Sequence, residues 1–421
     1  MRALPIKWAH RATRHRRTHG WSVMADWSAL PSDLVRSVAD RLLAVANDVD
    51  YYMHMRAVCH SWRLALADPC RCIADADLLR FRPRHWIMLH DGEDEDEPVD
   101  DSGVIHLFLN VATGRFLRRR VPLLQNHVLV AASDGLLVLS DKKYPHQASV
   151  LNLLTGSLVR FTAATIPHVN RVRAAVTGSE DHPSLSLVFS FFHDPYSDAV
   201  SCAHPTGGEL SPVQQLPHPG GAGPFLCSKQ ASMATYQGHV YMADRDGQIV
   251  RFVVTSAQQH HCHAELIGKA PSESVTGGRC GRAFLVASDG ELLLVRLYHL
   301  RRRRAVEVFR VDVERKAPLE HVWSLGRRAL FLGGRCLSVN AGELPCVDGD
   351  CVYLASENGN VAWRYDPRDG SERRISSFDA RPFGLVQVLL NYCVIQPDAK
   401  AQLHSVYRTI VTHESWGIKL S

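Results

Sequence analysis

Residues 134–156 read DGLLVLSDKKYPHQASVLNLLTG and contain two apolar runs and two kinds of turn. The pair Asp134-Gly135 is typical of a tight hairpin turn, because glycine adopts a positive φ without steric cost. The runs Leu136–Leu139 and Val150–Leu154 are short, as expected of buried strands. Asn152–Gly156 is a second turn signal, since an Asn side chain bonds to the backbone just after it. The stretch predicts β-strands joined by tight turns.

Both turn signals recur from residue 102 onward. The Asn/Asp-to-Gly type and its His variant occur at Asn110–Gly114, Asn152–Gly156, His204–Gly207 and Asp366–Gly370, and Asp-Gly occurs at positions 134, 246, 289 and 348. The 42 residues from Asn110 to Asn152 fit a four-stranded propeller blade of about 40–50 residues. We therefore predict that residues 102–421 form an all-β domain, a six- or seven-bladed β-propeller, with a pair of β-sandwiches as the alternative.

The chain before this region has a helical period. Ser28 is a candidate N-cap, and Pro31 suits the first turn of a helix. An apolar stripe then recurs every three or four residues, at Leu34, Val35, Val38, Leu42 and Leu43. The polar break Asn47–Asp50 can cap a second short helix, and Cys59–Arg63 opens a third. Three short helices cannot bury a stable core alone, so we expect a partner or neighbouring domain to cover them.

Three motifs in this segment resemble an F-box. They are Leu30-Pro31-Ser32-Asp33-Leu34-Val35, Arg41-Leu42-Leu43 and Arg56-Ala57-Val58-Cys59-His60-Ser61-Trp62-Arg63, all within residues 27–68. In that family a helical hairpin docks on the Skp-type adaptor of an SCF ubiquitin ligase. The resemblance assigns residues 24–70 to an F-box and implies an adaptor interface formed or supported by Leu30, Pro31, Leu34, Val38, Leu42, Val58, Cys59 and Trp62. The alternative is a helical cap on the downstream domain.

A second resemblance covers nearly everything from residue 24 onward. Its motifs are Phe81-Arg82-Pro83-Arg84 with Trp86, Ser133-Asp134-Gly135-Leu136, LGRRALFLG at 325–333, Glu343-Leu344-Pro345 and Val352-Tyr353. They resemble a plant family that joins an F-box to a KIB-type β-propeller. The resemblance implies a substrate-recognition subunit of an SCF-type E3 ligase. Its F-box would reach the cullin core through the adaptor, and its propeller would bind an unidentified protein target.

This interpretation implies a non-catalytic protein in the nucleus or cytoplasm, which contributes proximity rather than bond chemistry. The alternatives are a scaffold propeller without ligase activity and an organellar propeller. The propeller residues that contact a target cannot be read from the sequence. Trp323, Trp363 and Tyr365 lie in strand-like patterns, so we expect them to pack within the blades.

Charge and composition limit the other function classes. Residues 1–23 hold six cations and no acid, and removing them takes the net charge from +5 to −1, so the folded body has no general basic footprint for nucleic acid. Arg118–Arg120 and Arg301–Arg304 are the only basic clusters there, and we interpret them as solvated. The basic N-terminus is expected to be a disordered extension, with an organellar address or a nuclear-import patch as alternatives. No apolar run approaches the roughly 18 residues of a membrane span.

The sequence contains no common catalytic or metal signature. We find no GxSxG, P-loop, HExxH or paired CxxC, and we expect neither a cofactor nor a metal. In His260-His261-Cys262-His263, adjacent side chains of an extended segment would point to opposite faces, which disfavours a single zinc site. The 11 cysteines are odd in number and irregularly spaced, as expected of reduced thiols. Residues 71–101, with the acidic run Asp91–Asp101, are interpreted as a linker.

Overall fold

The structure is a computed structural model of the 421-residue chain. It describes residues 26–46, 49–69, 79–89, 105–166, 172–178, 185–191, 199–207, 211–215, 231–254, 262–271, 279–299, 304–315, 317–355, 361–375 and 385–393. The basic N-terminus, the acidic run, His260, His261 and Arg301–Arg303 lie outside these ranges, so the predictions made for them stay predictions.

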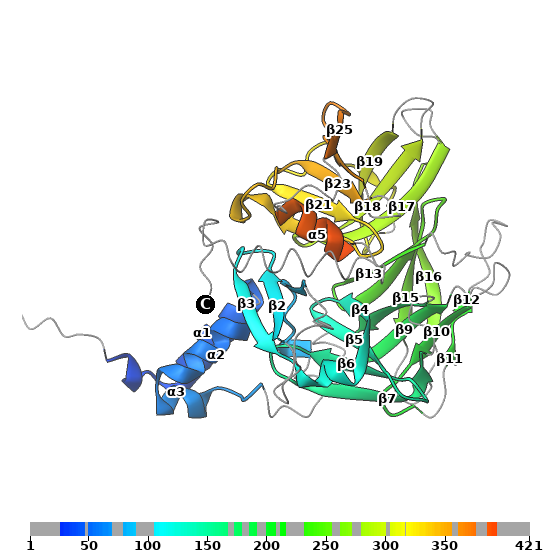
Figure 1. Cartoon of the computed structure of the whole chain (residues 1–421). Coiled ribbons are helices and arrows are strands. Elements are labelled where there is room, and N and C mark those ends of the chain that lie inside the picture. The colour runs from blue at the N-terminus through cyan, green and yellow to red at the C-terminus, as the bar shows by residue number, and fades with distance from the viewer. Residues whose placement is uncertain are drawn as a thin grey trace, which may run out of the picture.

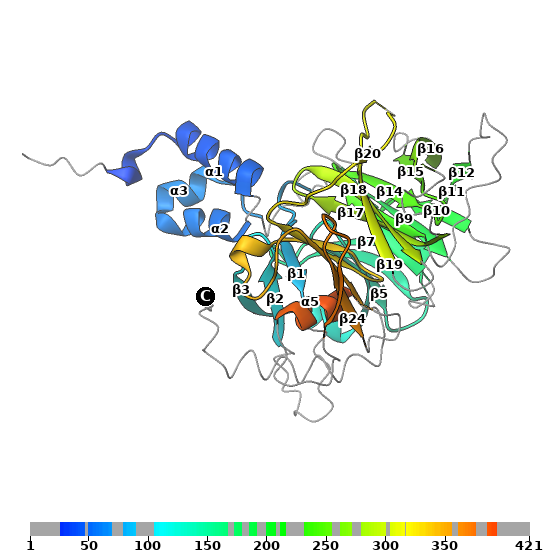
Figure 2. The same ribbon diagram turned by 90° about the horizontal axis from the view of Figure 1, so that it is seen from above.

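The β-region forms six sheets arranged around a common axis, which is a six-bladed β-propeller (Figures 1 and 2). Blade 1 contains β1 (Trp86–Met88), β2 (Ile105–Asn110) and β3 (Phe116–Arg120). Blade 2 contains β4 (His127–Ser133), β5 (Leu136–Asp141), β6 (Gln147–Asn152) and β7 (Leu158–Thr165), after the 3-10 turn η2 (Pro122–Gln125). Blade 3 contains β8 (Val172–Thr177), β9 (Ser186–Phe191), β10 (Ala199–Ala203) and β11 (Ser211–Pro212).

The second half of the ring consists of blades 4, 5 and 6. Blade 4 contains β12 (Gln214–Gln215), β13 (Ser232–Tyr236), β14 (His239–Ala243), β15 (Gln248–Val254) and β16 (Cys262–Lys269). Blade 5 contains β17 (Arg279–Ser288), β18 (Glu291–His299), β19 (Arg304–Val311) and β20 (Glu320–His321). Blade 6 contains β21 (Arg328–Leu332), β22 (Leu337–Asn340), β23 (Cys351–Ala355), β24 (Ala362–Tyr365) and β25 (Glu372–Ile375), with η4 (Ala341–Glu343) before β23.

The core consists of six apolar clusters, each between two consecutive blades. Strand β17 illustrates how one strand contributes to two clusters, because alternate side chains point to opposite faces of a sheet. Leu285 packs toward blade 4, whereas Phe284 and Val286 pack toward blade 6. Both faces of a blade are therefore buried, which explains continuous apolar runs such as Leu292–Val295.

The turn predictions are confirmed where the structure describes them, except at Asp348-Gly349, which lies between η4 and β23 and does not close a hairpin. At Asn110–Gly114 the Asn side chain accepts hydrogen bonds from the amides of Ala112 and Thr113, at 3.0 and 3.1 Å. Asn152 makes the equivalent pair of bonds in blade 2. Asp134-Gly135 and Asp289-Gly290 both have positive φ at both positions and close the hairpins β4–β5 and β17–β18.

The ring closes between blade 6 and blade 1 with the help of a C-terminal helix, α5 (Leu385–Cys393). The sequence pattern predicts only strands in this region, so α5 is a difference from that prediction. Leu389 and Leu390 are fully buried with Ile87 of β1 and Phe331 of β21 in one cluster. Strand β1 itself lies inside the segment 71–101 that was interpreted as a linker. A three-residue strand is too short to carry a clear period, which is why it was missed.

The N-terminal segment forms three short helices, as predicted: α1 (Ser32–Ala46), α2 (Val49–Val58) and α3 (His60–Ala65). They form a helical unit beside blades 1 and 2 (Figures 1 and 2). The third helix begins at His60, within the stretch predicted to open it, and Cys59 is its N-cap. Ser28 does not cap α1, because it lies in the one-turn 3-10 helix η1 (Trp27–Ala29), which Asp26 caps.

Candidate protein-interaction site

The helical unit has two apolar faces with different environments. Val35, Ala39 and Leu43 of α1 are buried in the cluster that also contains Phe81, Phe108 and Leu139 near and within blades 1 and 2. Leu34 and Val38 are four residues apart on another side of α1, and they are 49% and 54% exposed. Docking on the propeller therefore uses only part of the apolar surface of the helix and leaves an aliphatic pair in solvent.

The eight residues assigned to the adaptor interface divide into two groups. Pro31, Leu34, Val38 and Val58 are exposed. Leu30, Leu42, Cys59 and Trp62 are half-buried, and Leu30, Leu42 and Trp62 pack against the cluster shared with the propeller. The first group can contact a partner directly. The second group supports the helices, with Cys59 accepting a hydrogen bond from the Trp62 amide at 3.4 Å.

Two further residues of the exposed apolar surface were missed from the sequence. Trp27 and Leu64 are 64% and 73% exposed. The indole Nε1 of Trp62 donates a hydrogen bond to the carbonyl oxygen of Trp27 at 3.0 Å, so η1 lies against α3. A helical period does not reveal these residues, because Trp27 precedes α1 and α3 has only six residues.

Ion pairs fix the helical unit on the propeller. Asp50 of α2 pairs with Arg115, whose guanidinium also lies over the rings of Tyr51 and Trp86 at 4.7 and 5.5 Å. Asp40 of α1 pairs with Arg80, which lies in the segment before β1. The contacts join both long helices to the chain around blade 1, so the exposed pair on α1 is held on a fixed base.

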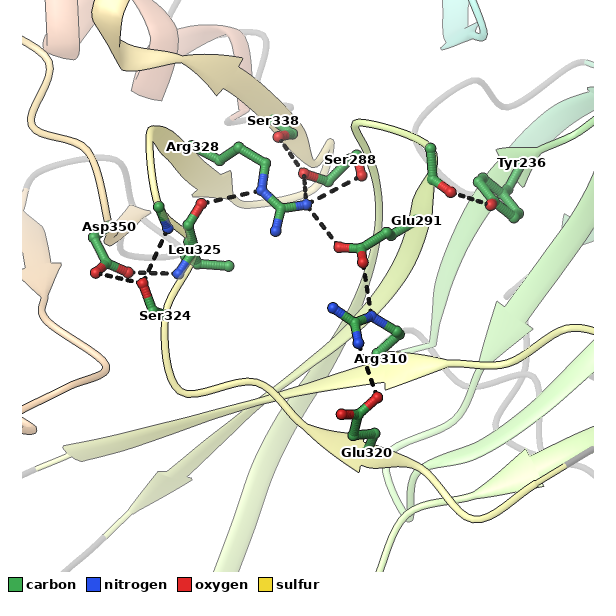
Figure 3. A network of polar contacts seen from close by, with 12 residues as sticks. Tyr236, Ser288, Glu291, Arg310, Glu320, Ser324, Leu325, Arg328, Ser338 and Asp350 are labelled. Atoms are coloured by element: carbon green, nitrogen blue, oxygen red, sulfur yellow. Dashed lines mark hydrogen bonds and ion pairs between the residues drawn. The ribbon is translucent and has the colours of Figure 1, made fainter.

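A polar network lies between blades 5 and 6 (Figure 3). Glu291 accepts a hydrogen bond from Arg328 of β21 at 2.8 Å and forms an ion pair with Arg310 of β19 at 2.7 Å. Arg310 also pairs with Glu320 at 2.8 Å. Partial burial opposes ionisation of Glu291, but Arg328 and Arg310 outweigh it and lower the pKa of this carboxyl. We interpret the network as a link between neighbouring blades.

The expected aromatic packing is only partly confirmed. Tyr365 is buried and Trp363 is half-buried under Arg304, whose guanidinium lies 3.6 Å from the centre of its ring. Trp323 was expected to pack within a blade, but it is 63% exposed and stacks at 3.9 Å on His321. It follows the short edge strand β20, where no neighbouring strand covers it.

The described residues contain no group of three or more His, Cys, Asp and Glu side chains placed to hold a metal ion. Cys262 of the His/Cys run is buried between blades 3 and 4. The eight cysteines in the described ranges are all free thiols. No helix in the same part of the chain is long and apolar enough to cross a membrane.

A family comparison agrees with this architecture. The KIB1-4 beta-propeller family matches residues 108–379. The chain belongs to this family. The family region of this KIB1-4 propeller begins within β2 and ends just after β25, so it includes nearly all of the ring and excludes the helical unit and α5.

Comparison with curated proteins found no match. Solved structures resemble the KIB1-4 propeller only distantly. An oligogalacturonate lyase from Vibrio parahaemolyticus is 9% identical, with 69% of this chain and 76% of that chain covered and a TM-score of 0.30. The Cps50 (Swd1) β-propeller domain of Myceliophteria thermophila is 13% identical, with 65% and 80% covered and a TM-score of 0.32.

Proposed function

We propose that this KIB1-4 propeller is the substrate-recognition subunit of an SCF-type ubiquitin ligase. The helical unit binds the Skp-type adaptor, and the propeller binds the protein target. The observation that carries the proposal is the exposed aliphatic surface of Leu34, Val38 and Val58, on helices whose other apolar face is already buried on the propeller. Large exposed apolar side chains gathered on one unit are typical of a protein interface.

The exposed surface has the chemistry that an adaptor helix needs. An amphipathic partner helix gains most of its affinity by burying aliphatic and aromatic side chains at the centre of the contact. Trp27 and Leu64 add a large aromatic and a flexible aliphatic side chain to the same unit. In this arrangement the chain supplies binding and proximity, and the ubiquitin-transfer chemistry belongs to the rest of the ligase.

Binding of the purified full chain to a Skp-type adaptor tests the proposal. We expect the Val38→Asp change to weaken binding by about 100-fold or more, because it removes buried aliphatic area and places a charge in the contact. The melting temperature should hardly change, since Val38 is exposed in the free protein. The matched control is Ile105→Asp, which puts the same charge at a 40% exposed aliphatic position on β2.

Two results would contradict the proposal. A folded chain that does not bind the adaptor would favour the alternative, a scaffold protein in which the helices only cap the propeller. The docking of α1 through Val35, Ala39 and Leu43 is the observation that favours that alternative. Binding that survives Val38→Asp unchanged would move the interface away from this helix.

A further inference from the structure

The inner strands of the six blades enclose a central channel with a volume of about 940 Å³, lined by residues of every blade. Many of the lining side chains are small and apolar, among them Ala131, Ala174 and Ala234. Hydroxyl groups bond between blades along the wall, as between Ser133 and Thr235 at 2.7 Å. A space of this size and character suits a small ligand or a side chain of a bound protein.

Five arginines line the channel, and they differ in whether the protein already engages them. Arg84, Arg173 and Arg328 interact with other groups of the chain. Arg327 and Arg335 pair with no carboxylate among the described residues. Arg327 is exposed, so water screens its charge, whereas Arg335 is half-buried. Arg335 is therefore the lining arginine best able to take a counter-ion from a ligand.

The carboxylates of the channel lie at one end of it, called here the turn end, where the hairpins β4–β5 and β17–β18 turn. The described lining residues include three carboxylates, and all lie at or beside these turns: Asp134, Asp289 and Glu291. The hydroxyl of Ser338 in β22 bonds at 2.7 Å to that of Ser288, which directly precedes the β17–β18 turn. Arg335 precedes Ser338 by three residues, about 10 Å of extended chain. Arg335 therefore lies further along the channel, away from the turn end.

Contacts with α5 hold Arg335 in place. Its backbone amide donates a hydrogen bond to the carbonyl oxygen of Cys393 at 3.1 Å. Its guanidinium lies 5.3 Å from the centre of the Tyr392 ring, and both residues line the channel. Burial raises the pKa of Tyr392 to about 12, although the charge of Arg335 acts in the opposite direction, so the phenol is neutral at pH 7. Tyr392 therefore positions the guanidinium without neutralising it.

The guanidinium of Arg335 has a donor that the protein leaves unused. Its Nε is buried and has no hydrogen-bond partner among the described residues. A buried donor without an acceptor is unfavourable, so an acceptor supplied by a ligand stabilises the site. A carboxylate matches one guanidinium closely, because its two oxygens accept two parallel N–H groups and its single negative charge balances the single positive charge.

We propose that the central channel contains a binding site for one carboxylate group, which Arg335 binds through its guanidinium. The small apolar side chains of the wall contact the rest of the ligand. The carboxylate belongs either to a small organic acid or to an acidic side chain of a bound protein. The site is separate from the exposed surface of α1 and does not depend on adaptor binding.

Titration of the full chain with benzoate and with benzamide, followed by NMR, tests the site. The two probes have the same apolar ring, but only benzoate has a carboxylate, so we expect benzamide to bind at least about 10-fold more weakly. Arg335→Gln should weaken benzoate binding by about 10-fold or more and leave benzamide binding unchanged. Arg335→Lys keeps the charge but loses the paired donors, so it should also weaken benzoate binding and provides the test if Arg335→Gln does not fold.

Arg327→Gln is the matched control. Arg327 also lines the channel, but it is exposed and directly precedes β21, whose first residue Arg328 pairs with Asn340 at the turn end. We expect this variant to change benzoate affinity by less than about twofold. Equal binding of benzoate and benzamide, no saturable binding of benzoate by the folded protein, or an equal loss in Arg327→Gln would overturn the proposal.

One further ligand identifies the source of the carboxylate. It is a short glycine peptide with blocked ends and a single central glutamate. Tighter binding of the peptide than of benzoate assigns the site to acidic side chains of proteins, and tighter binding of benzoate assigns it to small organic acids. Both results support the site when Arg335→Gln weakens them. Adaptor binding, measured on the same variants, keeps this result separate from the ligase proposal.

Discussion

Gly135 and Gly290 occupy the same position in two Asp-Gly hairpin turns, but their surroundings differ. Both have positive φ, +80° and +76°. A Cβ atom at Gly135 would lie 2.2 Å from the carbonyl oxygen of Pro83, whereas a Cβ at Gly290 would meet nothing within 4 Å. The Pro83 carbonyl belongs to the segment that connects the helical unit with β1. The sequence predicted both turns, but nothing local could show that a distant segment lies against only one of them.

The two alanine substitutions should therefore lower the free energy of unfolding by different amounts. We expect Gly290→Ala to destabilise the protein by about 1 kcal/mol, from the positive φ alone. Gly135→Ala should cost about 1–3 kcal/mol more, because the Pro83 segment must move. Urea unfolding of both variants measures the difference. Equal midpoints would show that the Pro83 segment does not rest on this turn.

Strands and turns were the part of the fold that the sequence revealed best. Asn110–Gly114 and Asp366–Gly370 close through bonds within five residues, so their residue types are sufficient to predict them. Strand β1 and helix α5 were missed because their stability comes from each other and from blade 6 rather than from a local pattern. Four residues that the F-box resemblance implied for an adaptor interface, Pro31, Leu34, Val38 and Val58, are exposed. The central channel was not predicted, because the residues that line it come from all six blades and are far apart in sequence.

The link between β19, β18 and β21 through Glu291 makes a prediction about pH. The lowered pKa of Glu291 means that its ion pairs stabilise the fold above the ordinary carboxyl value of 4.5 and are lost as the pH falls through the lower folded value. Glu291→Gln should therefore melt at a lower temperature than the unmodified chain at pH 7, and the gap should shrink below about pH 4.5.

Glu320→Gln is the matched control for this link. Glu320 also pairs with Arg310, but its side chain is 68% exposed, so water and salt screen the pair. We expect a much smaller loss of melting temperature at every pH. A gap for Glu291→Gln that is independent of pH would show that packing of the side chain, and not its charge, holds the blades together.

The complete ring depends on contacts between segments at opposite ends of the described chain. Ile87 and Leu389 lie in one cluster, and the amide of Asn340 in blade 6 donates a hydrogen bond to the carbonyl of Val111 beside blade 1 at 3.4 Å. Blade 1 is also the smallest sheet, with three strands. It has the helical unit on one side and α5 on the other.

Removing a single side chain of α5 should loosen both sides of the closure. We expect Leu389→Ala to cost about 2–5 kcal/mol, as for other fully buried leucines. Hydrogen exchange should become faster in β1–β3 and in β21–β25 together. Leu293→Ala in β18 is the control with equal burial, and its effect should remain within blades 5 and 6. Faster exchange in α5 alone would contradict its role in closing the ring.

The contact of α5 with blades 1 and 6 also implies an order in which parts of the chain can fold during synthesis. The apolar partners of the helical unit extend no further than Leu158, so they have all been synthesised while blades 3 to 6 are still missing. The contact that closes the ring forms only after Leu385–Cys393 have been synthesised. Domains generally fold as the chain emerges. The surface proposed for the adaptor can therefore form while the chain is still being synthesised, long before the six blades close around the central channel.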